Sequence, residues 1–109
     1  MPAVKEPKDV RAILTATGLP VAYRMWEEGE SPDPPFCVYY AGQANNMAAD
    51  GVVYFSAQRY TIELYTDAKE PETEALVERA LTAAGIYWTK DETYIESEHM
   101  HEIIYEIEV

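Results

Sequence analysis

The stretch that decides the fold is residues 52–66, with the sequence VVYFSAQRYTIELYT. In its second half, Tyr60, Ile62 and Leu64 alternate with polar or charged residues, which predicts a strand that buries one face. The first four residues keep no single alternating phase, which indicates a bulge or a bend. This is the longest strand pattern in the chain, so the neighbouring elements are placed relative to it.

Upstream of this strand, residues 36–41 (FCVYYA) are mostly aromatic or apolar and predict a buried strand. Residues 42–51, between the two strands, are small and polar with turn-forming Asn and Gly, and predict a long exposed loop or a hairpin tip. Such a loop has few side chains that can build a core, so we expect it to be mobile in a free protomer and ordered after assembly. Its candidate assembly residues are Asn45, Asn46, Met47 and Asp50.

Two helices are predicted on either side of this strand pair. Pro71 suits the first helical position and Gly85 suits a helix end, so a helix is predicted between them. Its predicted apolar stripe consists of Leu76, Val77, Ala80, Leu81 and Ala84. Near the N-terminus, residues 7–17 predict a shorter helix, which Gly18 ends.

Three shorter strands complete the prediction, over residues 21–27, 86–90 and 101–109. The order of elements is therefore α-β-β-β-α-β-β. A length of 109 residues suits one core, so we expect a single domain over residues 1–109. The predicted fold class is α+β, with two helices packed on one face of a mainly antiparallel four- or five-stranded sheet.

The charge balance argues against several classes of partner. Eight Lys and Arg residues against 20 Asp and Glu residues give a net charge of -12. This charge disfavours binding to a nucleic-acid backbone or to anionic lipid. No apolar run approaches the ~18 residues that a membrane span needs, and residues 1–7 lack the apolar core of a signal peptide. We therefore expect a protein that is made in the cytoplasm and has no membrane partner.

The sequence contains little that indicates catalysis. The single cysteine, Cys37, lies in the apolar strand and is predicted to be buried and unreactive. His99 and His101 are predicted to share a strand face, but no further ligands of suitable spacing accompany them, so we expect no metal and no cofactor. None of the many carboxylate pairs is marked by an apolar pocket that would raise a pKa. We therefore do not expect an enzyme.

Two features of the composition each allow two interpretations. Nine tyrosines are compatible with an ordinary core and equally with an interface, where Tyr is enriched. Residues 92–109 contain six Glu and neither Lys nor Arg. A stripe of one sign is tolerable on a solvated face, or at a place where repulsion is useful.

Five segments, in the same order, resemble a family of small prophage proteins from Gram-positive bacteria. They are residues 17–23 (TGLPVAY), 28–36 (EGESPDPPF), 62–67 (IELYTD), 84–86 (AGI) and 92–98 (ETYIESE). The family lies in the head-to-tail gene block of long-tailed phages and is identified as the tail terminator, or tail completion protein. The resemblance implies a structural protein of the virion, with two helices against a small sheet and no catalytic residues.

The resemblance also implies partners. Proteins of this kind form a ring of six copies that caps the finished tail tube, contacts the major tail tube protein and then docks to the head-completion or connector proteins. DNA passes through the ring without specific binding, and an acidic lining would repel its phosphates. The candidate channel-facing acids are Glu102, Glu106 and Glu108.

Three alternatives remain open. The chain could be another neck component, either a head-closure protein or a connector, which would share the fold and the compartment. It could be an acidic DNA mimic that inhibits a nuclease or a repressor. A closed ring would argue against this alternative. It could also be a small enzyme or ligand-binding domain, which a deep pocket joining the histidines to several carboxylates would favour.

Overall fold

The computed structural model describes the backbone of residues 7–27, 29–49 and 52–109, and the side chains of the same residues outside 43–57. In chain order the elements are α1 (Pro7–Thr15), β1 (Val21–Tyr23), β2 (Phe36–Ala49), β3 (Val52–Thr66), α2 (Pro71–Ala83), β4 (Trp88–Ile95), the 3-10 turn η1 (Glu96–Glu98) and β5 (Met100–Glu108). This succession confirms the predicted order of helices and strands.

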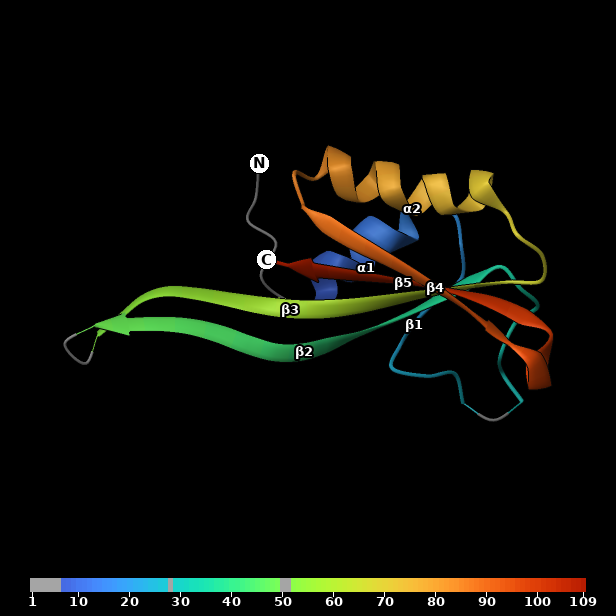
Figure 1. The fold of residues 1–109 in the computed structure, drawn as a ribbon, viewed down its shortest axis with the longest axis horizontal. Helices are drawn as coiled ribbons and strands as arrows, with labels where there is room; N and C mark the ends of the chain where they lie inside the picture. The colour runs from blue at the N-terminus through green and yellow to red at the C-terminus, as the bar shows by residue number, and fades with distance from the viewer. Residues whose placement is uncertain (1–6, 28, 50–51) are drawn as a thin grey trace.

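All five strands form one sheet, in the order β1-β2-β3-β5-β4. β1 is parallel to β2, and the other neighbouring pairs are antiparallel. Both helices pack on one face of this sheet (Figure 1), which confirms the predicted α+β class. In the part of the chain that the structure describes, neither helix has the length and apolar character needed to cross a bilayer.

The core lies between the helices and the face of the sheet that they cover. Val10 and Leu14 of α1 belong to the same buried cluster as Val77 and Leu81 of α2. The strands contribute to this cluster Val21, Cys37, Tyr39, Tyr60, Ile62, Leu64, Ile103, Tyr105 and Ile107. The predicted inward alternation of β3 and the predicted burial of the cysteine are therefore confirmed.

The boundaries predicted for the three shorter strands are wrong. β1 ends at Tyr23 and does not continue to residue 27, because Arg24 has a left-handed backbone with φ of 68° that interrupts the extended chain. The strand predicted over residues 86–90 begins two residues later and extends to the end of β4 at Ile95. The last strand, β5, starts one residue earlier than predicted and ends one residue earlier.

The apolar stripe predicted for α2 is wrong at one position. Leu76 is 37% exposed, whereas Glu74 is only 2% exposed. Val77 and Leu81 face the core as predicted. A carboxylate can be buried in this way only when other groups compensate its charge.

Of the two predictions for residues 42–51, the hairpin is confirmed, because β2 and β3 form an antiparallel pair that reaches Ala49 and Val52. The long exposed loop is wrong, because β2 continues through residues 42–49. There it pairs with residues 52–58 of β3, and the two strands run beyond the rest of the sheet (Figure 1). We call residues 42–49 and 52–58 the arm. The molecule is correspondingly elongated, with extents of 51 × 26 × 23 Å.

The pairing of β2 with β3 is irregular at two places. The first lies just after Ala41, where β2 has one residue more than β3. The second lies beside Met47 and Ala48, whose partners Phe55 and Val53 enclose one unpaired residue of β3. This second irregularity confirms the bulge predicted for the first half of β3.

Candidate functional site

The face of the sheet away from the helices carries the acids of β5. Ile103, Tyr105 and Ile107 are buried toward the core, so the residues between them point to the opposite face, which we call the open face. The three acids predicted to face a channel therefore lie on one face of one strand. They are Glu102, Glu106 and Glu108.

These three acids have different surroundings. A carboxylate oxygen of Glu108 lies 3.3 Å from Nε of Arg59, and both side chains are exposed, so this ion pair contributes little to stability. Glu102 is half-buried and accepts a hydrogen bond of 2.9 Å from the hydroxyl of Tyr65. Glu106 is exposed to solvent. The acidic stripe is therefore not a uniformly solvated row.

Glu63 and Glu102 form a carboxyl pair around Tyr65. The Tyr65 hydroxyl lies 2.9 Å from a carboxylate oxygen of Glu102 and 3.3 Å from one of Glu63. The ring of Tyr65 stacks on Phe36, and Trp26 packs edge-on against Phe36, so the pair has an apolar border. Burial raises the pKa of Glu63 to about 7, and the hydrogen bond and the charge of Glu102 act in the same direction. Glu63 therefore binds its proton more tightly in the folded protein than in the unfolded chain.

This pair contradicts the prediction that no carboxylate lies where its pKa would be raised. Glu63 and Tyr65 are two residues apart, so they share one face of a strand, and this part of the cluster is visible in the sequence. Glu102 is brought opposite Tyr65 by the register of β3 with β5. That register joins residues 37 positions apart in the chain and cannot be obtained from local pattern alone.

Replacing Glu63 by Gln is expected to flatten the pH dependence of stability between pH 4.5 and about 7. The pKa of Glu63 is raised in the folded protein from 4.5 to about 7, so its contribution to stability is complete below pH 4.5 and is lost as the pH rises to about 7. At about pH 8 the variant should exceed the wild type by about 1 kcal/mol, after allowance for solvent screening.

Urea unfolding at about pH 5 and about pH 8 measures this effect, with Glu106→Gln as the exposed control on the same face. If Glu63→Gln keeps the wild-type pH slope, Glu63 does not bind its proton more tightly in the folded state.

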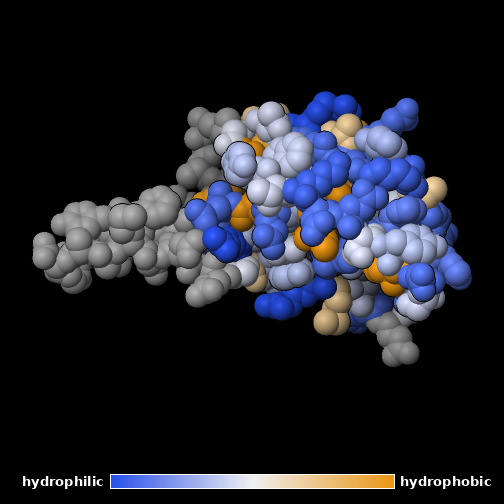
Figure 2. Space-filling view, in the orientation of Figure 1, coloured by the Kyte–Doolittle hydropathy of each residue, from blue (hydrophilic) through white to orange (hydrophobic). Residues whose placement is uncertain are grey.

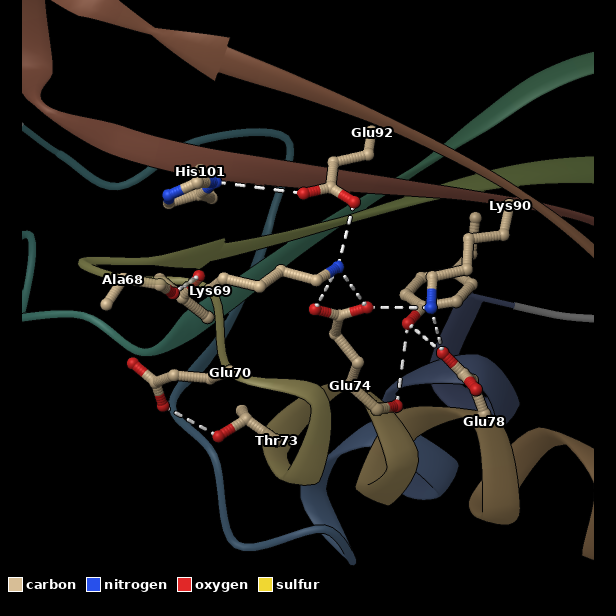
Figure 3. A network of polar contacts seen from close by, with 11 residues as sticks. Ala68, Lys69, Glu70, Thr73, Glu74, Glu78, Lys90, Glu92 and His101 are labelled. Atoms are coloured by element: carbon tan, nitrogen blue, oxygen red, sulfur yellow. Dashed lines mark hydrogen bonds and ion pairs between the residues drawn. The ribbon is translucent and has the colours of Figure 1, made fainter.

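A second polar cluster joins α2 to the edge of the sheet (Figure 3). Its centre is Glu74, whose side chain is 2% exposed. One carboxylate oxygen of Glu74 lies 2.8 Å from Nζ of Lys69, and the other lies 2.7 Å from Nζ of Lys90. Each lysine also contacts a second acid, because Lys69 is 2.8 Å from Glu92 and Lys90 is 2.8 Å from Glu78. The charges alternate in one continuous chain of ion pairs.

The pKa shifts in this chain keep both signs of charge ionised at neutral pH. Burial alone would raise the pKa of Glu74, but the two lysines outweigh burial and hold that pKa below its ordinary value. Hydrogen bonds to Glu74 and Glu92 raise the pKa of Lys69. Burial opposes the charge of Lys90, yet its acidic partners raise its pKa overall. Groups that stay ionised around pH 7 are poorly matched to proton transfer there, so the cluster is suited to holding α2 in place.

The two histidines do not share a strand face, contrary to the prediction. His99 follows η1 in a left-handed conformation with φ of 51° and lies outside β5. His101 lies in β5, where its ring packs against Tyr94 with centroids 5.0 Å apart and its Nδ1 is 3.7 Å from a carboxylate oxygen of Glu92. Among the residues that the structure describes, no three metal-ligating side chains are grouped as a metal site would require.

An open depression of about 320 Å³ lies where the arm leaves the body of the molecule. Its lining consists of Arg59, Tyr87, Thr89, Glu106, Ile107 and Glu108. Tyr87 is 82% exposed there. Tyr and Arg are among the side chains that are enriched at protein interfaces. The coloured part of the surface in Figure 2 is mostly hydrophilic, with small separate apolar areas.

The predicted assembly residues lie on the arm as far as the structure describes them. Asn45, Asn46 and Met47 belong to β2, where they pair with residues 55–57 of β3. The fourth residue, Asp50, lies outside the described residues. The segment predicted to mediate assembly therefore projects from the body as a ribbon of two strands.

No protein-family model matches this chain, and no curated protein matches it. Among solved structures, the chain is similar to one in a structure described as "Virion of native gene transfer agent (GTA) particle", with a TM-score of 0.47 and 14% sequence identity. The similarity covers 92% of this chain and 83% of that chain. At this identity no residue role carries over from one chain to the other.

Proposed function

We propose that this chain is a structural subunit of a phage-like particle, and that it forms the ring of the tail terminator. The observation that carries this proposal is the arm. A ribbon of two strands has no core of its own and is marginally stable in water, and its open edges are places where another chain can pair. A protein that builds such a ribbon is suited to an assembly.

The body of the molecule supports the same proposal. Two helices on one face of a small sheet form the protomer that the resemblance to tail terminators implies. The open face carries three glutamates in one strand and would repel DNA phosphates. Such a surface suits a channel through which DNA slides without being held.

The proposed mechanism is assembly and involves no reaction. Six copies form a ring on the last tier of the tail tube and prevent the addition of further tube subunits. The opposite side of the ring then offers a new surface to the head-completion or connector proteins. The protein would therefore be located in the virion, between tail and head.

Deleting the gene from a phage or prophage that carries it tests this proposal. We expect tails of irregular length that do not join heads, and we expect the wild-type gene supplied in trans to restore both properties. Electron microscopy of the lysate measures tail length and joining. Tails of normal length that merely fail to join heads would assign the chain to another neck component, and binding to purified head proteins but not to tail tube protein would do the same.

A further inference from the structure

Both edges of the arm are open. β1 pairs with β2 only as far as Tyr39, so none of the described strands lies on that side of β2 along residues 42–49. β5 pairs with β3 only as far as Arg59, and the last backbone hydrogen bonds on that side join Gln58 to Val109. Within the described part of the chain, no strand covers either edge beyond these points. The arm therefore presents two different strand edges, one from β2 and one from β3.

The arm has two irregularities in its pairing, but it lacks the other common protection of free edges, which is charged residues or Pro along the strand. Natural edge strands carry charged residues or Pro that oppose pairing with another chain. Charged residues make up 26% of the chain, yet none of the residues in the arm is charged and none is Pro. Of the two outer strands of the body, β4 is protected, because Lys90, Asp91 and Glu92 follow one another there. The other outer strand, β1, is only three residues long. Among the described strands, the arm therefore has the longest edges without charge or Pro.

The hydrogen-bonding phase identifies backbone groups that face outward from the arm. Gln58 exchanges both of its backbone hydrogen bonds with Val109, each at 2.9 Å, so its N–H and C=O point away from β2. In an antiparallel pair this direction alternates, so Ser56 points outward in the same way. Asn46 is the partner of Ser56 in the register, and its backbone groups point outward on the other edge. Each edge thus offers a donor and an acceptor for a further strand.

We propose that these edges pair with a second copy of this chain, the β2 edge of one arm against the β3 edge of the next. This inference rests on the proposed ring function and assigns the contact that closes the ring. Because the two edges differ, the contact is head-to-tail, which generates a ring when the rotation closes. The whole chain has a net charge of -12, so two copies repel each other, whereas residues 42–49 and 52–58 carry no charge and form the segment through which like-charged copies can meet.

Deleting residues 43–57 and joining Gly42 to Gln58 through an Asn-Gly turn is expected to abolish self-association. Sedimentation velocity should find oligomers for the wild type and monomers for the deletion, and a cooperative urea transition should show that the body still folds.

A finer variant, Asn46→Pro, removes one outward N–H without removing a bond inside the arm. It should weaken association at least about tenfold, and Ser56→Pro should do the same from the other edge.

Leu76→Ala, on the exposed side of α2, is the matched control and should leave association unchanged. Hydrogen exchange at Asn46 and Ser56 should be fast in the monomer and slow in the oligomer. Oligomers formed by the deletion variant would overturn the arm contact while leaving the ring proposal intact. A wild type that stays monomeric but still caps purified tail tubes would show that the edges of the arm bind the tube protein and not a second copy. Tails of normal length in the absence of the gene would contradict the ring proposal itself.

Discussion

Replacing both Lys69 and Lys90 by Met is expected to lower the free energy of unfolding by about 3 kcal/mol at neutral pH. The double variant leaves the carboxylate of Glu74, 2% exposed, without either of the cations that lie 2.8 and 2.7 Å from it (Figure 3). Met keeps most of the apolar stem of each lysine, so the change removes charge and little packing. A buried charge that has lost its partners is among the largest single causes of instability.

The pH dependence of this loss has a definite sign. In the wild type the lysines lower the pKa of Glu74, so the stabilisation that it provides is present above the ordinary value of 4.5 and is lost as the pH falls through the folded-state pKa. In the double variant burial is left as the main influence and raises that pKa. The difference between the two proteins should therefore shrink as the pH falls toward about 4, which urea unfolding at two pH values measures.

The control adds Glu74→Leu to the double variant. An apolar side chain of similar volume at a buried site removes the uncompensated charge and should recover most of the lost stability. A triple variant as unstable as the double variant would show that the lysine stems, and not the charges, stabilise this corner of the fold.

The thiol of Cys37 is expected to react with a thiol reagent at least about a thousandfold more slowly in the folded protein than in the unfolded chain. The residue is fully buried, in register with Val21 of β1 on one side and Leu64 of β3 on the other. Burial raises the pKa of the thiol from 9.0 to about 12, which alone lowers the reactive thiolate fraction at about pH 8 by about three powers of ten.

A chromogenic disulfide reagent measures this rate in buffer and in concentrated urea. The matched control places a cysteine at an exposed strand position, Thr89→Cys, in a chain that also carries Cys37→Ser. That thiol should react in the folded protein about as fast as in urea. Fast reaction of the wild type without denaturant would contradict the burial of Cys37. If the reaction is slow, its rate measures how often β1 and β2 separate and expose the thiol.

The elements that the sequence predicted correctly are those whose signals are local. Tyr60, Ile62 and Leu64 alternate within one strand and lie in the core as expected, and Gly85 lies just after the second helix. The strand over residues 52–66 was predicted with the bounds of β3. The other half of the arm was missed, because residues 42–49 are mostly small and polar and have low intrinsic strand preference. Their strand conformation comes from pairing with β3, which is a property of two segments together.

The polar clusters were missed for a related reason. Glu63 meets Glu102, and Glu74 meets Lys90, only after separate elements have been brought into register. In a chain with 20 acids, many such pairs are compatible with the sequence, and the fold selects among them. One prediction needed only the two-residue period of a strand, and it is confirmed. It placed Glu102, Glu106 and Glu108 on one face of the last strand.

The division of the chain into an acidic body and an uncharged arm has a consequence for the protomer before it meets its partners. With the arm contact that we propose, each free protomer has one uncharged segment that can pair with another copy, and the remainder of the chain carries the negative charge. Head-to-tail contacts that fail to close grow into open fibres. Mutual repulsion between chains that each have a net charge of -12 opposes such growth. If copies pair through the arm as we propose, the acidic surface keeps unassembled subunits apart, while the arm remains available for pairing.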